Sequence, residues 1–500
     1  MARTGARKIN VADELLGNHR RDRGDKVAFF WGEERVTYAD TAANVNKFAN
    51  VLRDKGVKPT ERVMILLPDS PLFVYAFLGS VKYGAWPVPV NTMLEEEDYH
   101  YLLNDSEARV LVTTEDSKAA GIETEHLRAK ILCDHRFQEV LNAASPEADP
   151  FLADPEDIAF WLYSSGSTGR PKPTPHKHSS MLFTAETYGK NVLGITENDV
   201  CFSVSRLFFA YGLGNSLTFP LRFGASAILL SDPPSPEKVL EVLVTYRPTV
   251  FFGVPTMYNS LLKRMNLTTL PGLRMCLSAG EALPPEIYRQ WKAKTGLEII
   301  DGIGSTEALH IFISNRPGST REGASGSVVP GYEAKIVNDD GTEVPVGETG
   351  HLIIRGESLT PGYWNRPEQN SEKMLPDGWF RTGDMYSRDN GHFIYQGRGD
   401  DMLKVGGIWV SPMEIEYVLM EHPAVNECAV VGREVEGLVK PFAYVVLNAS
   451  DGSEDEQQMS LELMEFLASR LPKFKRPWGI RFLDSLPKTA TGKVRRFKLR

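Results

Sequence analysis

Short apolar runs, each followed by turn residues and a helical pattern, fill the first two thirds of the chain. Residues 62–67 read Arg-Val-Met-Ile-Leu-Leu and predict a strand, and 71–83 predict a buried helix. Further strands are predicted at 200–203, 227–230, 249–252, 274–277 and 298–300, and a further helix at 286–294. Repeated strand–loop–helix units predict parallel sheets covered by helices. In such sheets, ligands bind where loops leave the carboxyl ends of strands.

The pattern changes beyond about residue 320. Short apolar runs at 334–337, 351–355 and 392–396 alternate with Gly-containing turns and predict antiparallel hairpins. Another unit follows 397–401, with helices predicted at 412–422 and 461–471 and strands at 429–431 and 442–447. We therefore predict an α/β protein with two domains. Residues 1–399 form a large N-terminal domain of parallel, helix-covered sheets plus a small β-barrel-like part, and residues 400–500 form a small α+β C-terminal domain.

A polar stretch follows one of the predicted strands directly. Residues 158–162 are apolar and predict a buried strand, and residues 163–172 read Tyr-Ser-Ser-Gly-Ser-Thr-Gly-Arg-Pro-Lys. Glycines let successive backbone N–H groups turn toward one point, hydroxyl groups add donors, and Lys172 adds a mobile positive charge. The stretch does not fit the Walker A pattern. It predicts a phosphate-binding loop, with a flexible surface loop as the alternative.

Composition narrows the class of protein. The 500 residues are 42% hydrophobic and 24% charged, which indicates a soluble globular protein of at least two domains. The formal net charge of −9 argues against a nucleic-acid partner. The amino terminus lacks an apolar signal segment, and no window approaches about twenty uninterrupted apolar residues. We therefore expect a cytoplasmic protein without a membrane partner.

The cysteines and histidines do not suggest a metal site. The four cysteines are far apart in sequence: Cys133, Cys201, Cys276 and Cys428. This spacing fits reduced thiols in the cytosol and excludes a zinc ribbon. His176 and His178 are two residues apart, and we do not expect a metal site there.

Five motifs occur in order along the chain. They are 163–172, Gly-Ile-Gly-Ser-Thr-Glu at 302–307, Arg-Thr-Gly-Asp at 381–384, Gly-Arg-Gly-Asp-Asp-Met-Leu-Lys at 397–404 and Pro-Lys-Thr-Ala-Thr-Gly-Lys at 487–493. Together they resemble the signatures of the adenylate-forming superfamily, which includes acyl- and aryl-CoA synthetases, peptide-synthetase adenylation domains and luciferases. Within it, residues 207–215 and 307–312 are most similar to benzoate–CoA ligases. The resemblance covers essentially the whole chain.

The resemblance implies ATP, Mg²⁺ and coenzyme A, and it gives roles to individual residues. Thr168 and its loop would hold the β- and γ-phosphates, Thr306 the α-phosphate, and Glu307 the Mg²⁺. Without the resemblance, Thr306-Glu307 would read as an ordinary helix N-cap followed by an acid. Asp384 and Arg398 would contact the ribose, and adenine would lie near Asp301. The predicted ATP- and AMP-binding residues are Ser164, Ser165, Gly166, Ser167, Thr168, Gly169, Lys172, Gly280, Glu281, Ala282, Asp301, Gly302, Ile303, Gly304, Ser305, Thr306, Asp384 and Arg398.

Lys493 resembles the family's adenylation lysine, which bridges the acid's carboxylate and the α-phosphate. By itself, a lysine in a C-terminal tail is usually only solvated. The resemblance also implies that the C-terminal domain is a mobile cap that swings about Asp400 after the adenylate forms. The swing would withdraw Lys493, place Gly406 and Gly407 beside a pantetheine tunnel, and turn Lys404 toward the site. The predicted catalytic residues are Lys493, Lys404, Thr168, Glu307 and Asp400.

The predicted acyl pocket indicates an aromatic acid. Amino-acid-activating relatives have an aspartate after the residue matched by Phe209, whereas this chain has Ala210. An amino-acid substrate would therefore leave a buried ammonium group unpaired. His310 would either orient the carboxylate or fill a wall, and glycines would let the backbone approach the ring. The predicted substrate-contacting residues are Ala210, Tyr211, Gly212, Ala279, Gly280, Gly302, Gly304, His310 and Ile311.

We therefore expect an AMP-forming benzoate–CoA ligase that acts as a monomer or homodimer. The alternatives are the same chemistry on a hydroxy-, halo-, methyl- or aminobenzoate, an acyl-adenylate-binding protein without turnover, and adenylation for a carrier protein. The chain departs from the family pattern at two positions. Pro173 replaces a glycine and removes a backbone donor, and Lys177 stands where relatives usually have a small hydroxyl residue.

Overall fold

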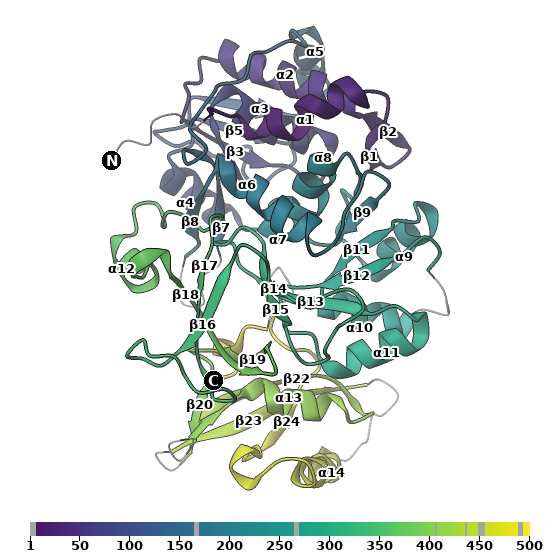
Figure 1. Ribbon diagram of the computed structural model, residues 1–500, viewed down its shortest axis with the longest axis vertical. Coiled ribbons are helices and arrows are strands. Elements are labelled where there is room, and N and C mark those ends of the chain that lie inside the picture. The colour runs from purple at the N-terminus through teal and green to yellow at the C-terminus, as the bar shows by residue number, and fades with distance from the viewer. Residues whose placement is uncertain are drawn as a thin grey trace.

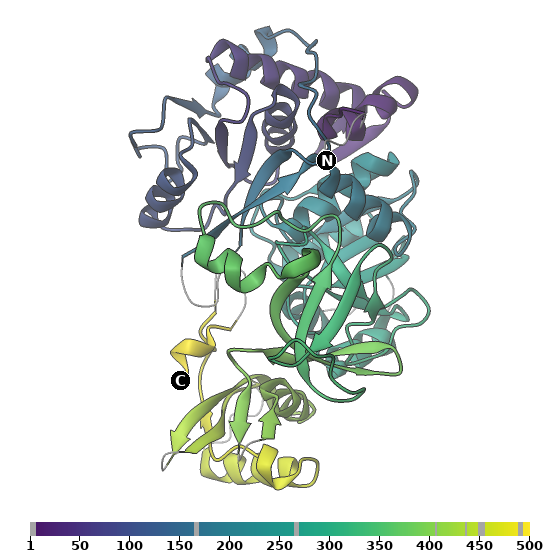
Figure 2. The same ribbon diagram turned by 60° about the vertical axis from the view of Figure 1, so that its left-hand side comes forward.

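The computed structural model describes residues 7–164, 170–264, 270–405, 408–435, 438–448, 456–488 and 494–500. The chain runs from an N-terminal part at the top of Figure 1, through an antiparallel sheet, to a C-terminal unit at the bottom. Figure 2 shows this C-terminal unit as a separate lobe below the rest of the molecule. Parallel sheets with helices form the larger part, so the predicted α/β class with a smaller C-terminal domain is confirmed.

The largest sheet has nine strands in the order β15-β14-β13-β12-β11-β9-β10-β1-β2. Neighbours from β13 to β1 pair in parallel, and β2, β14 and β15 add antiparallel edges. The strands are β1 (Val27–Trp31), β2 (Glu34–Thr37), β9 (Val200–Ser203), β10 (Ser226–Leu229), β11 (Val250–Gly253), β12 (Met275–Ser278), β13 (Ile299–Gly304), β14 (Ile311–Ser314) and β15 (Ser327–Val328).

Both faces of this sheet are buried. On β11, Phe251 belongs to one core with Tyr258 and Trp291, and Phe252 belongs to the opposite core with Leu213. Burial on both sides explains why these strands are continuous apolar runs instead of alternating ones. The helices that follow the strands in this region are α7 (Ala210–Leu213), η2 (Gly214–Thr218), α8 (Phe219–Phe223), α9 (Pro236–Thr245), α10 (Pro255–Arg264) and α11 (Pro285–Thr295).

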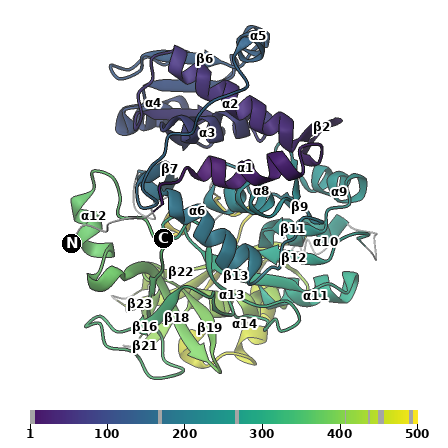
Figure 3. The ribbon, with the colours of Figure 1, turned by 45° about the horizontal axis from the view of Figure 1, so that its top comes forward.

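A second, four-stranded parallel sheet has the order β4-β3-β5-β6. Helix α3 begins after Ser70, whose hydroxyl accepts the Phe73 N–H, and ends at Gly84 with φ 93°. It is apolar on all sides because α1 and α2 pack against it, as Figure 3 shows. The elements of this region are α1 (Val11–Asp22), α2 (Tyr38–Asp54), β3 (Arg62–Leu66), α3 (Pro71–Tyr83), β4 (Trp86–Pro89), α4 (Glu96–Ser106), β5 (Val110–Thr113), β6 (Ala129–Leu132) and α5 (His135–Ala143).

The predicted phosphate loop connects two antiparallel strands. β7 (Ile158–Ser164) and β8 (Lys172–Lys177) form a two-stranded sheet, and α6 (His178–Thr184) and η1 (Ala185–Lys190) follow. The interpretation that this loop leaves a strand of a parallel sheet is therefore wrong. The reason is that 172–177 is extended and returns along β7, with Ser164 opposite Lys172.

Residues 333–398 form a four-stranded antiparallel sheet in the order β16-β17-β18-β19, with β16 and β19 at its edges. This sheet corresponds to the part expected to be barrel-like. Its elements are β16 (Glu333–Val337), β17 (Gly350–Arg355), α12 (Pro367–Lys373), η3 (Pro376–Gly378), β18 (Phe380–Asp389) and β19 (His392–Arg398). β18 was not among the strands expected from the sequence.

The C-terminal unit has its own core, which includes Val410, Ile415, Val430, Val445 and Leu463. β22 and β23 are antiparallel and β24 pairs in parallel with β23. The elements are β20 (Leu403–Val405), β21 (Ile408–Val410), α13 (Pro412–Met420), β22 (Val425–Val435), β23 (Leu438–Leu447), α14 (Glu456–Ala468), η5 (Lys473–Lys475), β24 (Ile480–Phe482) and η6 (Arg496–Lys498). The predicted domain boundary at 399/400 falls between the end of β19 and the start of β20.

Candidate active site

Glu307 lies in a tight turn between β13 and β14. The Leu309 N–H donates to the Thr306 carbonyl at 3.0 Å, and the Ala308 N–H donates to Ser305 Oγ at 3.2 Å. No helix begins here, so the alternative interpretation of Thr306-Glu307 as a helix N-cap is wrong. The hydroxyl of Tyr363 donates to Glu307 Oε1 at 2.7 Å.

Lys172 and Arg398 approach the same tyrosine. Lys172 Nζ lies 4.9 Å from the centre of the Tyr363 ring. Burial and the Glu307 carboxylate raise the pKa of Tyr363, and the nearby Arg398 guanidinium opposes them. The residues predicted for the phosphates, the metal and the ribose therefore lie around one buried side chain.

Asp384 and Arg398 are opposite each other on β18 and β19. Arg398 Nη1 lies 3.1 Å from Asp384 Oδ1 and also donates to the Thr382 carbonyl. The Asp384 backbone N–H donates to Thr382 Oγ1, which fixes the turn around Gly383. Their pairing places a carboxylate and a guanidinium side by side, a set of groups that suits two ribose hydroxyls.

The predicted adenine residues lie at the ends of neighbouring parallel strands. Ser278 of β12 is opposite Asp301 of β13. Asp301 is buried, its Oδ1 has no hydrogen-bond partner with normal geometry among the described residues, and burial raises its pKa well above the usual range. Gly280 adopts φ 91°, and the place of its absent Cβ is open. An open strand end with a free acceptor oxygen suits a planar heterocycle with N–H groups.

The C-terminal unit packs against this strand end. Burial and the carboxylate of Asp301 are the main causes that raise the pKa of Tyr417, a residue of α13. Arg289 of α11 also pairs with Glu421 at 3.5 Å, and Lys263 of α10 contacts Asn426. The predicted adenine pocket is therefore next to the interface between the two domains.

The residues predicted for the acyl pocket come together from three segments. Ala210 and Tyr211 begin α7, and the Tyr211 ring lies 5.5 Å from the ring of His310 and 6.1 Å from that of Phe252. Ala279, His310 and Ile311 are buried. His310 also contacts Tyr188 and Phe219, at 5.2 and 4.6 Å between ring centres. The walls are aromatic and aliphatic, and Ala210 provides no charge.

Three glycines of this region have neighbouring backbone beside them. A Cβ at Gly212 would lie 2.1 Å from the Arg206 carbonyl oxygen. A Cβ at Gly302 or Gly304 would collide with the carbonyl of Ile313 or His310, respectively. These glycines are therefore required so that α7 and the β13–β14 hairpin can pack closely. The expectation that they let the backbone approach a substrate ring stays a prediction.

The two departures from the family pattern have local explanations. The Pro173 carbonyl accepts from the Trp364 N–H at 3.0 Å, so this residue directs its backbone groups away from β7. The N–H that proline lacks would lie on that outer edge, and no β7–β8 bond is lost. Lys177 pairs with Glu156 at 2.9 Å, next to the start of α6.

Two family models match the chain, and together they cover both domains. The model of the AMP-binding enzyme matches residues 17–364, and that of the AMP-binding enzyme C-terminal domain matches residues 414–493. The chain belongs to the AMP-binding enzyme family.

Relatives of this family member cover its whole length. The chain is 44% identical to a benzoate–CoA ligase of Thauera aromatica, over 99% of this chain and 96% of the relative. It superposes with a TM-score of 0.91 and 43% identity on a benzoate CoA ligase from Burkholderia xenovorans LB400, covering 98% of this chain and 100% of the other. An anthranilate CoA ligase in complex with anthranoyl-AMP gives a TM-score of 0.94 at 38% identity, over 100% and 98% of the two chains.

Several predicted residues of the AMP-binding enzyme lie outside the described residues. They are Ser165, Gly166, Ser167, Thr168, Gly169, Gly406, Gly407 and Lys493, together with the side chain of Lys404. Their neighbours are described: Ser164 ends β7, and Lys488 forms a bridge with Val494 on either side of the segment that holds Lys493. The roles expected for these residues stay predictions.

The residues present fit a magnesium ion that is bound mainly by a nucleotide. Glu307 Oε1 accepts from Tyr363, and Oε2 makes no hydrogen bond or ion pair within the part of the chain that the structure describes. In that same part, no group of three or more His, Cys, Asp or Glu side chains is placed to hold a metal. Magnesium commonly takes one or two protein carboxylates and completes its shell with phosphate and water oxygens. Glu307 would be that carboxylate.

His176 and His178 are both buried, and neither belongs to a metal-binding cluster of described residues.

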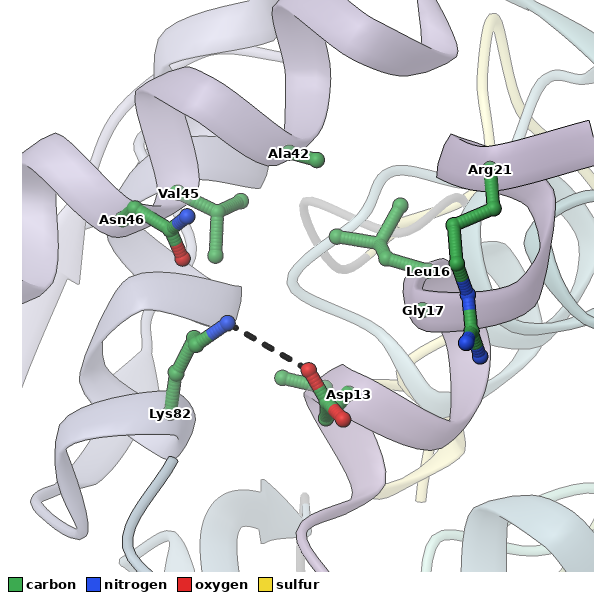
Figure 4. A pocket seen from close by; sticks show the side chains of 9 residues that line it. Asp13, Leu16, Gly17, Arg21, Ala42, Val45, Asn46 and Lys82 are labelled. Carbon is green, nitrogen blue, oxygen red and sulfur yellow. Dashed lines mark hydrogen bonds and ion pairs between the residues drawn. The ribbon is translucent and has the colours of Figure 1, made fainter. Parts of the chain in front are cut away.

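A cavity of about 390 Å³ lies between α1, α2 and α3, and the Lys82–Asp13 pair at 3.3 Å crosses it (Figure 4). It is lined by none of the predicted site residues. Among the described helices, each is too short or too polar to serve as a membrane span.

Sequence reasoning missed two residues that shape the site. Tyr363 bonds Glu307, and Asn215 Oδ1 lies 3.1 Å from His310 Nε2. Asn215 stands in η2, a π-helical turn between α7 and α8, and such turns often occur at functional sites. The resemblance to benzoate–CoA ligases included Asn215 in its motif, which was the available signal. Tyr363 has no comparable signal, because its partner is 56 residues away in sequence.

Proposed function

We propose that the protein is a benzoate–CoA ligase, which converts benzoate, ATP and CoA into benzoyl-CoA, AMP and pyrophosphate. The observation that carries this proposal is the cluster of Ala210, Tyr211 and His310, the residues predicted to form the acyl pocket. The cluster is aromatic and buried, and Ala210 provides no carboxylate that could receive an amino acid's ammonium group. The names of the relatives from Thauera and Burkholderia support the same substrate.

In the first step, a carboxylate oxygen of benzoate attacks the α-phosphorus of ATP, and the bond to the β-phosphate breaks to release pyrophosphate. Lys172 and the β7–β8 hairpin hold the leaving phosphates, and Asp384 with Arg398 holds the ribose. Glu307 would hold Mg²⁺, which would offset phosphate charge. Lys493 neutralises charge between the carboxylate and the α-phosphate. Positioning and charge neutralisation account for such a reaction without a covalent enzyme intermediate.

In the second step, the CoA thiolate attacks the carbonyl carbon of benzoyl-AMP, and AMP leaves. We propose that the cap turns about Asp400 between the steps. Two features support a turn at this place. The link between the domains is short, because β19 ends at Arg398 and β20 begins at Leu403. In addition, the contacts between Arg289 and Glu421 and between Lys263 and Asn426 are exposed polar pairs, which break at little cost.

ATP–pyrophosphate exchange tests the proposal at its first step. With benzoate, ATP and Mg²⁺ but no CoA, the protein should incorporate labelled pyrophosphate into ATP. Exchange that depends on benzoate separates an enzyme from an adenylate-binding protein without turnover. No exchange with any benzoate would overturn the proposal.

A substituted benzoate is the second candidate, and one observation favours it. The Tyr211 hydroxyl and His310 Nδ1 are buried and have no hydrogen-bond partner with normal geometry among the described residues. A hydroxyl or amino group on the substrate ring could satisfy such atoms, and the relative solved with anthranoyl-AMP acts on an aminobenzoate. Exchange rates with benzoate, 2-aminobenzoate and the hydroxybenzoates decide between the two.

We place the reaction in the cytoplasm, where CoA and ATP are available. The four cysteines support this, because all are unpaired and none forms a disulfide.

A further inference from the structure

The loop between β17 and α12 holds Glu307 from two directions. The Thr360 N–H donates to the Glu307 carbonyl at 2.8 Å, and the Tyr363 hydroxyl donates to Oε1 of its carboxylate at 2.7 Å. The two contacts fix both the backbone and the side chain of Glu307. A carboxylate held at one oxygen has its other oxygen in a defined direction.

Tyr363 is itself fixed by its surroundings. Its N–H donates to Asn370 Oδ1 at 2.7 Å, and its carbonyl accepts from Asn370 Nδ2 at 2.8 Å. Only 4% of its surface is exposed. A phenol is a protonated donor throughout the neutral range.

The same loop contacts the phosphate hairpin. Lys172 Nζ lies over the face of the Tyr363 ring, and the Trp364 N–H donates to the Pro173 carbonyl. Lys172 makes no ion pair among the described residues, so its charge is available to a phosphate. Tyr363 thus contacts both Lys172, the predicted phosphate-binding cation, and Glu307, the predicted metal-binding carboxylate.

We propose that Tyr363 is a positioning residue that turns the Glu307 carboxylate so that Oε2 faces the metal of bound MgATP. This inference rests on the proposed function only in taking ATP and Mg²⁺ as ligands. Groups that orient a metal's ligand typically change metal affinity or activity by about 10–100-fold when they are removed. Tyr363→Phe removes the hydroxyl but keeps the ring beneath Lys172, so it isolates the bond to Glu307.

Binding of ATP, measured by calorimetry with excess Mg²⁺ and again with EDTA, tests the proposal without the acid or CoA. Tyr363→Phe should weaken binding in Mg²⁺ by about 10-fold or more and in EDTA by less than about 2-fold. In a protein that already carries Glu307→Gln, Tyr363→Phe should change the affinity for ATP in Mg²⁺ by less than about 2-fold, because the hydroxyl then has no metal-binding carboxylate to orient. Tyr83→Phe is the matched control, since it removes a partly buried hydroxyl that donates to the Val57 carbonyl far from the site.

Two results would overturn the role of Tyr363. One is equal weakening with and without Mg²⁺, which would mean that the hydroxyl supports loop packing only. The other is a full effect of Tyr363→Phe in the Glu307→Gln protein. Failure of the proposed function would look different, as absent benzoate-dependent exchange in a protein whose MgATP binding is intact.

Discussion

The imidazole of His176 stacks on the ring of Phe160, with 5.1 Å between ring centres and 26° between planes. No part of its surface is exposed, and neither ring nitrogen has a hydrogen-bond partner with normal geometry among the described residues. Burial lowers the pKa of His176 to about 3, although the backbone of Thr306 opposes the shift. The histidine is therefore an uncharged ring that supports the turn holding Thr306 and Glu307.

This burial predicts a loss of stability in mild acid. The pKa of His176 is about 6.5 in the unfolded chain and lower in the folded protein. Between these two pKa values the unfolded chain therefore binds a proton that the folded protein does not bind. The contribution of neutral His176 to the free energy of unfolding is complete above about pH 6.5 and falls as the pH drops toward 3. At pH 5 the free energy of unfolding is lower by about 2 kcal/mol for this reason. His178, with its pKa lowered to about 4 by burial, adds in the same direction.

Urea unfolding at about pH 7.5 and about pH 5 measures this effect. His176→Phe keeps the aromatic stack, so the difference between the two pH values should shrink by about 2 kcal/mol relative to the wild type. The exposed His135→Gln should leave the difference unchanged. An unchanged difference in His176→Phe would show that this histidine is charged or solvated in the folded protein.

Asn215 should control how the acyl pocket holds its ring. Its Nδ2 donates to Ser203 Oγ at 3.2 Å, which orients Oδ1 toward His310 Nε2 and fixes that nitrogen as the donor. Asn215→Ala removes the acceptor, and we expect a cost of about 1–3 kcal/mol from the unpaired buried group. The KM for benzoate should rise about 10-fold with the affinity for ATP unchanged. Ser203→Ala should raise the KM for benzoate less, because Ser203 contacts Asn215 and not His310. If Asn215→Ala weakened the binding of benzoate and of ATP equally, the assignment of Asn215 to the acyl pocket would be contradicted.

Ala210→Asp should abolish the use of benzoate. A carboxylate at this buried position would stand beside the aromatic rings of the predicted pocket, and an unpaired buried carboxylate costs several kcal/mol and lowers kcat/KM by at least about 100-fold. Ala210→Ser, of similar size and without charge, should retain most activity. Steady-state kinetics with benzoate compare the two variants, and calorimetry with ATP verifies that both fold. If Ala210→Asp has normal kinetics, the start of α7 is not a wall of the acyl pocket.

Lys493→Ala should separate the two half-reactions. Adenylate formation should fall by about 10²–10³-fold, the usual cost of one preorganised donor. Thioester formation from synthetic benzoyl-AMP should stay largely intact, because the proposed turn of the cap withdraws Lys493 before that step. Lys488→Ala is the matched control: it changes a lysine at the base of the same segment that pairs with Glu427 on the cap itself. Equal loss of both half-reactions in Lys493→Ala would contradict its assigned role.

Much of the fold could be predicted, because burial on both faces of a parallel sheet leaves a plain apolar signal. β9 at Val200–Ser203 and α3 at Pro71–Tyr83 match the predicted bounds. β18 was missed because its ten residues, Phe-Arg-Thr-Gly-Asp-Met-Tyr-Ser-Arg-Asp, are mostly polar and contain Gly383 at φ 86°. Pairing with β17 and β19 makes this segment a strand, and that pairing is not visible in local sequence.

The residues of the candidate site, too, could be predicted only in part. Motif residues such as Glu307, Asp384 and Arg398 could be named from sequence, and the structure brings them together around Tyr363. The function of Tyr363 depends on a contact made only after folding. The antiparallel return of β8 along β7 was likewise not visible, because Lys-Pro-Thr-Pro-His-Lys has two prolines and little strand propensity. The hairpin tolerates Pro173 because this residue directs its backbone groups to the outer edge.

The formation of a CoA thioester tests the central claim most directly. The purified protein is incubated with ATP, Mg²⁺, CoA and either benzoate, acetate, a long-chain fatty acid or phenylalanine, and the products are identified by mass spectrometry. We expect benzoyl-CoA and AMP in equal amounts, with kcat/KM for benzoate far above that for the aliphatic acids and no product from phenylalanine. A protein that forms no thioester with benzoate or its ring-substituted forms, or that prefers a fatty acid, would contradict the account.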